Sequence, residues 1–299
     1  MNASSSTIAR SPRLAMASLP GQRTLALLWA NRQGRLGLVL IGLHLLLAIA
    51  GRWLAPHDIS AGDSLASLLP PSAEHWLGTD QLGRDVLSRT LAGGREAIFT
   101  SLPAAVLAVV WGSACGMLLA ILGGRVENLA MRLVDALLSI PWLLFLLLVI
   151  GVMGPGPLVF ILTLGIFYGV AVVRVMVTAC REVLCLDYIQ AARLRGDSLM
   201  RLLWHEIKPN VLDTILVELA MRWSWALLAF SSLSFLGFGV SPPTPDWGLM
   251  VADGRGFMSF APWAVLPPIV ALSSLIIAIN LVADTLAKTL GIDRAGRPE

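Results

Sequence analysis

Two charged residues, Glu218 and Arg222, lie inside the apolar run VLDTILVELAMRWSWALLAF and have the spacing most suggestive of chemistry. Their separation of four residues places both side chains on one face of a helix. A charge within lipid costs about 2.5–3.5 kcal/mol on insertion scales, so it is paired or faces a cavity. The spacing therefore predicts either a self-satisfied ion pair or an arginine that meets a carboxylate from outside the chain.

Motifs typical of enzymes do not accompany this pair. The chain's two lysines, Lys208 and Lys288, follow Ile and Ala, whereas a P-loop needs its lysine in a glycine-rich turn to reach the phosphates. The sequence also lacks a nucleophile elbow and a metal-binding HExxH helix. We therefore predict no catalytic residues and no nucleotide site, while an intramembrane enzyme stays open as an alternative.

The residues that most often bind metals are scattered along the chain. They are Cys115, Cys180, Cys185, His44, His57, His75 and His205. No Cys/His spacing resembles that of a zinc site, and three separated cysteines do not make a disulfide framework. The sequence thus predicts no metal site, ordinary thiols and structural histidines.

The composition indicates that these residues are carried by a membrane protein. Of 299 residues, 56% are hydrophobic and 14% charged, and the mean hydropathy is +0.76. Soluble domains usually have about 25% charged residues. The net charge of +3 does not indicate a nucleic-acid partner, because the basic residues are spread between apolar runs rather than gathered on one face.

A membrane-spanning helix requires about 20 mostly apolar residues. Six stretches qualify: 36–55, 97–122, 133–152, 158–178, 211–235 and 264–284. The predicted fold class is all-α, a polytopic membrane domain over 36–290 with six transmembrane helices. Pro103 and Pro141 interrupt two of the spans, and neighbouring helices can satisfy the carbonyls that a proline frees. Trp247 lies near a span end, a position typical of the interfacial belt.

The distribution of lysine and arginine predicts the orientation, because cytoplasmic loops are enriched in them. With the N-terminus inside, sixteen fall on the inner side and five on the outer side, with Arg222 inside a span. Both termini are therefore predicted to be cytoplasmic, as an N-terminal segment over 1–35 and a tail over 291–299. The loop 181–209 is then also cytoplasmic, and segments 56–95 and 240–263 are outside.

That cytoplasmic loop contains a polar helical stretch, DYIQAARLRGDSLMRLLWHEIKPN. It predicts two short helices broken at Gly196, with Asp197 and Ser198 available to cap the second. Ala191 and Ala192 would allow another surface to approach closely, and Arg193 would add a polar contact. A basic amphipathic helix on the membrane surface explains the same pattern.

Resemblance to a known family favours a surface that contacts another protein over a helix on the membrane surface. Several motifs carry this resemblance. AARLRG followed by HEIKPN resembles the cytoplasmic "EAA" loop of ABC-transporter permeases, with Gln190 in the glutamate position. HWLGTDQLGRDVLSR and SFLGFGVSPPTPDWG are similar to segments of the dipeptide, oligopeptide and nickel permeases, as are the shorter motifs around Asp135, Pro141 and Asp284. The resemblance covers about residues 33–290 and is to the C-type subunit of that family.

The resemblance implies a type I importer permease in the inner membrane. Its partners would be a second permease subunit, ATP-binding subunits that hold ATP and magnesium, and an external solute-binding protein. It implies peptide transport, with nickel or a metal chelate as the alternative, and no cofactor in this chain. The implied ATPase-coupling residues are Gln190, Ala191, Ala192, Arg193, Gly196 and Asp197, and Glu218 and Arg222 would border the translocation pathway.

Overall fold

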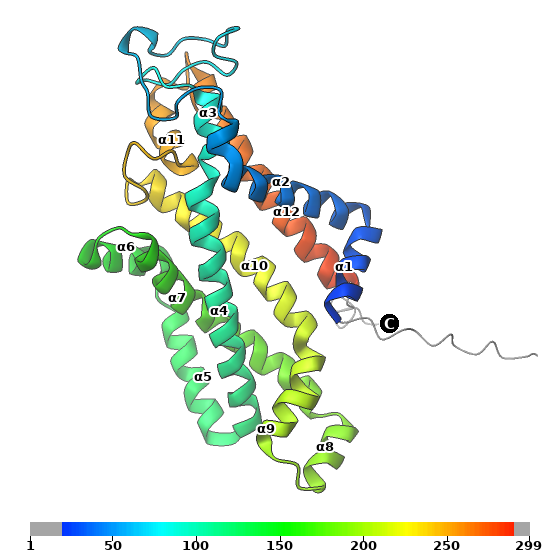
Figure 1. Ribbon diagram of the computed structural model, residues 1–299. Helices are drawn as coiled ribbons and strands as arrows, with labels where there is room; N and C mark the ends of the chain where they lie inside the picture. Colours follow the sequence, from blue (N-terminus) through cyan, green and yellow to red (C-terminus); the bar gives the residue numbers. More distant parts are fainter. Residues whose placement is uncertain (1–19, 290–299) are drawn as a thin grey trace, which may run out of the picture.

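The computed structural model describes residues 20–289, which form helices and connecting loops without a β-strand (Figure 1). Their order is α1 (Pro20–Ala30), α2 (Arg32–Leu54), η1 (Ser64–Ala66), α3 (Val86–Ala92), α4 (Gly94–Leu122), α5 (Gly124–Leu138), α6 (Trp142–Met153), α7 (Pro157–Leu184), α8 (Asp187–Leu194), α9 (Leu199–Arg201), η2 (Leu202–Ile207), α10 (Lys208–Phe235), α11 (Trp247–Gly254), η3 (Arg255–Phe257), η4 (Pro262–Ala264) and α12 (Leu266–Thr289). The all-α fold class is confirmed. The predicted tail over 291–299 and the first part of the predicted segment 1–35 lie outside the described residues.

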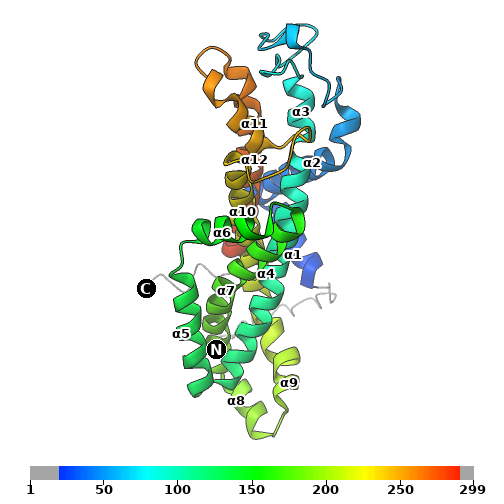
Figure 2. The ribbon, with the colours of Figure 1, turned by 90° about the vertical axis from the view of Figure 1, so that its left-hand side faces the viewer.

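The helices form an elongated bundle with two different ends (Figures 1 and 2). At one end, α3 and α11 lie beside the long loop that joins α2 to α3. At the opposite end, α8 and α9 lie beyond the ends of α7 and α10. The segments predicted to be outside and the loop predicted to be cytoplasmic are thus at opposite ends of the molecule.

The most extensive helix pairing is between α4 and α7, and glycine makes it close. A Cβ atom on Gly112 would lie 2.6 Å from the carbonyl oxygen of Gly169, so the two backbones leave no room for a side chain there. Trp111 covers the same face of α7 and donates its Nε1–H to the carbonyl of Gly165 at 2.9 Å. Small residues at helix contacts allow this packing in membranes, where van der Waals contact replaces the hydrophobic effect.

A second set of contacts joins α10 to α4 and α12, and α12 to α2. His44 of α2 is buried, and its Nε2 lies 3.1 Å from the carbonyl oxygen of Ala271 in α12. Its Nδ1 lies 2.9 Å from the carbonyl oxygen of Leu40. This histidine therefore connects two helices, as the predicted structural role requires.

The predicted count of six spans is not confirmed. Over residues 20–289, four helical segments are long and apolar enough to cross a membrane: 32–54, 86–122, 157–184 and 262–289. A fifth is reached if α5 and α6 count as one span, and α10, which carries Glu218 and Arg222, is not among them.

The predicted third span at 133–152 is not one continuous helix. α5 ends at Leu138, α6 begins at Trp142, and the two are bent by 78°. Pro141 lies at this break and cannot donate the backbone hydrogen bond that would continue α5. Pro103, by contrast, lies within the unbroken α4.

Candidate functional site

The first candidate site is the end of the bundle formed by α8, α9 and η2. Ile189 and Ala192 are buried in a cluster that includes Cys180 of α7 and Val211 of α10. One face of α8 is therefore fastened to both long helices. The predicted role of Ala192 as a small residue facing a partner does not match this burial, because its contacts are with the chain's own helices.

The opposite face of this end is exposed. Gln190 and Ala191 are exposed on α8, which also contains Arg193, and Leu194 at its end is 89% exposed. Several large apolar side chains share this exposure, namely Tyr188, Leu194, Leu199, Met200 and Trp204. We define these five residues as the α8–η2 apolar face.

The predicted break between the two short helices is confirmed. Gly196 has a φ of 82°, in the left-handed region that glycine adopts most easily, and no other atom would contact a Cβ at this position. The hydroxyl of Ser198 accepts a hydrogen bond from the Arg201 backbone at 3.3 Å and so caps α9. Asp197 pairs instead with the side chains of Arg195 and Arg201, at 3.4 and 3.5 Å.

The segment does not end at Lys208 and Pro209 as predicted. A π-helical turn, η2, leads directly into α10, which begins at Lys208. The Lys208 ammonium lies 4.1 Å from the centre of the Trp204 ring. Single π turns inside α-helices occur frequently at functional sites, and this one makes the polar segment continuous with the fifth predicted span.

The second candidate site is the charged pair in α10. Arg222 Nε donates to Glu218 Oε2 at 2.9 Å, and the exposed fractions of the two side chains are 17% and 11%. Trp225, one turn further along, is exposed. The pair is therefore satisfied within one helix, and it lies next to a part of α10 that the chain's own helices leave uncovered. A further ion pair joins Asp135 of α5 to Arg174 of α7, at 3.3 Å.

The third candidate site is a polar core at the end of the bundle that contains α3. Its residues belong to the stretch HWLGTDQLGRDVLSR, from which only a family resemblance was predicted. Arg84 Nε donates to Asp80 Oδ2 at 2.7 Å, and Arg89 Nε lies 3.6 Å from the same oxygen. All three side chains are buried. Arg89 also donates to the carbonyls of Ile59 and Pro243, at 2.8 and 3.3 Å. Three charged residues within the eleven letters GTDQLGRDVLS, together with Arg89 directly after them, were the signal that could have predicted this core.

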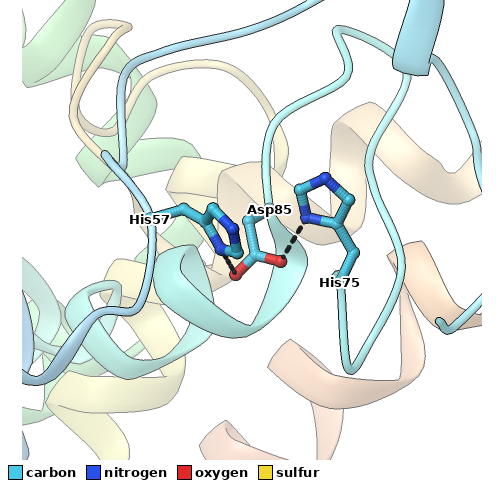
Figure 3. A group of neighbouring side chains, drawn as sticks. All are labelled: His57, His75 and Asp85. Carbon is cyan, nitrogen blue, oxygen red and sulfur yellow. Dashed lines mark hydrogen bonds and ion pairs between the residues drawn. The ribbon is translucent and has the colours of Figure 1, made fainter. Parts of the chain in front are cut away.

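Asp85, in the same motif, caps the start of α3 and brings two histidines together (Figure 3). Its Oδ2 accepts hydrogen bonds from the Ser88 backbone at 2.8 Å and the Ser88 hydroxyl at 2.7 Å. His75 Nδ1 lies 2.9 Å from Oδ1, and His57 Nδ1 lies 3.8 Å from Oδ2. Burial disfavours the charged carboxylate, but the hydrogen bonds from Ser88 and His75 outweigh it and hold the pKa of Asp85 below its usual range.

Asp246 and Trp247 connect the loop after α10 to this end of the bundle. Asp246 is buried and caps α11, with its Oδ1 accepting from the Leu249 backbone at 3.1 Å. Burial raises the pKa of Asp246 to about 6, although this hydrogen bond opposes the change. The prediction that Trp247 lies in an interfacial belt is wrong: it is 2% exposed and donates to the carbonyl of Thr90 at 2.8 Å.

We call the end of the bundle formed by residues 55–93 and 240–265, which include α3 and α11, the polar cap. An all-α bundle of apolar helices, with a helical extension at one end and this folded polar cap at the other, defines a multi-pass membrane protein. The sequence comparisons identify its class. The chain belongs to the family of binding-protein-dependent transport system inner membrane components, whose profile matches residues 98–291. A second profile, the N-terminal TM domain of oligopeptide transport permease C, matches residues 20–71.

Individual relatives are similar over almost the whole chain. The dipeptide transport system permease protein DppC of Haemophilus influenzae is 33% identical over 266 residues, which cover 87% of this chain and 90% of that protein. The di/tripeptide transport system permease protein DppC of Pseudomonas aeruginosa is 35% identical, covering 88% and 89%. The oligopeptide transport system permease protein OppC of Bacillus subtilis is 33% identical, covering 87% and 86%. The predicted resemblance to a C-type importer permease is confirmed.

Proposed function

We propose that this chain is the permease subunit of a peptide importer, and that α8 and α9 receive the movement driven by ATP in a separate subunit. The observation that carries the proposal is the α8–η2 apolar face, which lies at the end of the bundle opposite the polar cap. Exposed apolar side chains gathered in one place mark a surface that a partner or lipid covers. The partner we propose is the ATP-hydrolysing subunit, which makes this end cytoplasmic.

The packing of α8 supports a mechanical role. Ile189 and Ala192 join it to a cluster that contains residues of both α7 and α10. A displacement of α8 by a closing ATPase pair would therefore move both helices rather than a loose loop. Alternating access then results from a shift in population between inward-open and outward-open arrangements.

We propose peptides as the solute because the relatives reported above are named for dipeptides, di/tripeptides and oligopeptides. A separate solute-binding protein would deliver them to the polar cap, where Leu65, Trp76 and Phe260 are exposed. We place Glu218 and Arg222 on the wall of the pathway. The partial exposure of both side chains and the open surface at Trp225 support this position.

The coupling proposal is tested by adding a charge to the α8–η2 apolar face. Leu194→Asp would bury a carboxylate without a partner if an ATPase subunit docks there, at a cost of roughly 3 kcal/mol or more, which is over a hundredfold in affinity. The expected result is loss of the ATPase subunits during purification, with normal amounts of membrane-inserted permease. Leu65→Asp is the matched control for ATPase retention, because Leu65 is 92% exposed at the opposite end, away from the proposed ATPase surface.

A second variant tests the turn instead of the surface. Gly196→Val forces a β-branched residue into the left-handed region, so it should weaken ATPase docking and uptake while leaving insertion intact. The coupling proposal fails if both variants retain the ATPase subunits at wild-type yield and transport normally. That outcome would make α8 an ordinary helix on the membrane surface.

A further inference from the structure

His57, His75 and Asp85 come from three separate segments of the polar cap (Figure 3). His57 lies shortly after the end of α2, His75 lies within the loop that follows, and Asp85 is the residue before α3. One ligand atom from each residue lies within 4.8 Å of the others, and the two imidazole rings are centred 4.7 Å apart. The fold thus joins residues that no sequence spacing links.

The cluster contains an unsatisfied polar atom. His57 Nδ1 is buried from solvent and has no hydrogen-bond partner among the residues that the structure describes. It faces Asp85 Oδ2 at 3.8 Å, beyond hydrogen-bonding distance. A buried polar atom without a partner costs free energy, and a ligand that accepts its lone pair would remove that cost.

The carboxylate in the cluster is already oriented. Ser88 donates two hydrogen bonds to Asp85 Oδ2, and the same Ser88 hydroxyl accepts the backbone N–H of His57 at 3.0 Å. Hydrogen bonds to a ligating carboxylate are the usual means of fixing its direction in metal sites. Ser88 therefore connects two of the three residues and limits their relative movement.

The cluster opens onto a cavity of about 410 Å³. Apart from the cluster itself, three further acidic residues line it: Asp58, Asp63 and Glu74. The ionisable residues around this space are thus four carboxyl groups and two imidazoles. Such a lining favours a cation and leaves room for water to complete its coordination.

We propose that His57, His75 and Asp85 form a binding site for one divalent transition-metal ion in the polar cap. Two imidazole nitrogens and one carboxylate oxygen suit Zn²⁺, Ni²⁺ or Cu²⁺ better than Mg²⁺ or Ca²⁺, which prefer oxygen ligands. In a tetrahedral zinc site, bonds of about 2.0–2.1 Å place neighbouring ligand atoms about 3.3 Å apart. His75 Nδ1 lies 2.9 Å from Asp85 Oδ1, and His57 Nδ1 lies 3.8 Å from Oδ2. These distances are to the two different oxygens of the carboxylate, and they lie on either side of that value.

The ion would have a structural effect on the cap. It would tie the chain just beyond α2 to the start of α3, closing the loop that carries His75. The fourth coordination position would face the cavity and take a water molecule or a group from outside the chain. This inference depends only on the cap and stands or falls independently of the proposed solute.

The test uses the whole importer complex, treated with a chelator and then titrated with Zn²⁺. We expect the wild-type complex to bind one more zinc ion than a complex carrying His57→Gln and His75→Gln. Loss of an outer-shell partner alone costs about 10–100-fold in metal affinity, so losing ligands should weaken binding at least about tenfold. His205→Gln is the matched control, because His205 is exposed at the opposite end of the bundle, and it should bind zinc like the wild type.

A second measurement avoids any dependence on how the variants fold. Diethylpyrocarbonate modifies accessible imidazoles, and mass spectrometry reports the modification of each histidine. Zn²⁺ should protect His57 and His75 in the wild-type complex and leave His205 unchanged. Equal modification of His57 and His75 with and without Zn²⁺ would overturn the proposal, and so would equal zinc content in the wild type and the double variant.

Discussion

Variants of Glu218 and Arg222 can separate the contribution of this ion pair to protein stability from a role of Arg222 in transport. The two side chains share one hydrogen-bonded contact of 2.9 Å, and both are mostly buried. Replacing Arg222 by methionine keeps an unbranched side chain but removes the guanidinium, which leaves the carboxylate without its cation. Breaking a buried pair in this way costs about 3–5 kcal/mol, and we expect roughly 3 kcal/mol because both groups retain some exposure.

The double change Glu218→Gln with Arg222→Met removes both charges and should restore most of that stability. A difference of 1 kcal/mol shifts the unfolding midpoint by about 2–4 °C in proteins of 150–250 residues. The single variant should therefore unfold roughly 6 °C or more below the wild type, and the double variant close to it. The measurements are thermal unfolding of the purified complex, its assembled amount, and peptide uptake.

Uptake distinguishes the two interpretations of the pair. If Arg222 lines the pathway and meets the solute carboxylate, the stable double variant should still transport poorly, because the cation has not been replaced. The defect should be smaller for a peptide whose C-terminus is amidated. If uptake returns together with stability, Arg222 is only structural, and our placement of it on the pathway is refuted.

Three further predictions concern the rest of the chain. Because the pKa of Asp246 is raised from 3.8 to about 6 in the folded protein, stability should fall as pH rises from about 4 to 6. Asp246→Asn should still cap α11, should lose this pH dependence and should be up to about 3 kcal/mol more stable at pH 7. Thermal unfolding measured against pH tests both expectations. In cells, an impermeant thiol reagent applied outside should label Ala61→Cys and not Ser198→Cys, and the reverse pattern would contradict the proposed orientation. Gly169→Ala should destabilise the bundle by about 1–3 kcal/mol because a Cβ there collides with the ring of Trp111, and unchanged thermal stability would contradict the described packing of α4 on α7.

Local patterns in the sequence predicted those features whose causes are local. A glycine between two polar helical stretches predicts the turn at Gly196, because φ is a property of that residue alone. The spacing of Glu218 and Arg222 predicts their contact, because four residues make about one helical turn. Pro141 was predicted to interrupt the third span, but the 78° bend there was not predicted, because a proline can also lie within one continuous helix, as Pro103 does in α4.

Local sequence patterns do not predict features that depend on contacts between segments far apart in the chain. Trp247 resembles an interfacial tryptophan by its position along the chain, and its burial results from packing against α3 and α4, whose residues lie far away in sequence. The meeting of His57 with His75 depends on the course of an irregular loop, for which no periodicity exists. Scattered histidines in the sequence are therefore a poor basis for excluding a metal site when long loops connect them.

The two ends of the bundle are held by different kinds of interaction, and this difference bears on mechanism. In the polar cap, Arg89 is held at once by Asp80, Ile59 and Pro243, and hydrogen bonds to a charged group are directional. At the other end, α8 is held through Ile189 and Ala192 by apolar packing, which is non-directional. Small displacements of α8 therefore cost less than equal displacements within the cap. We expect a cap that keeps its shape while it receives a solute-binding protein, and an opposite end that shifts when a partner pushes on it.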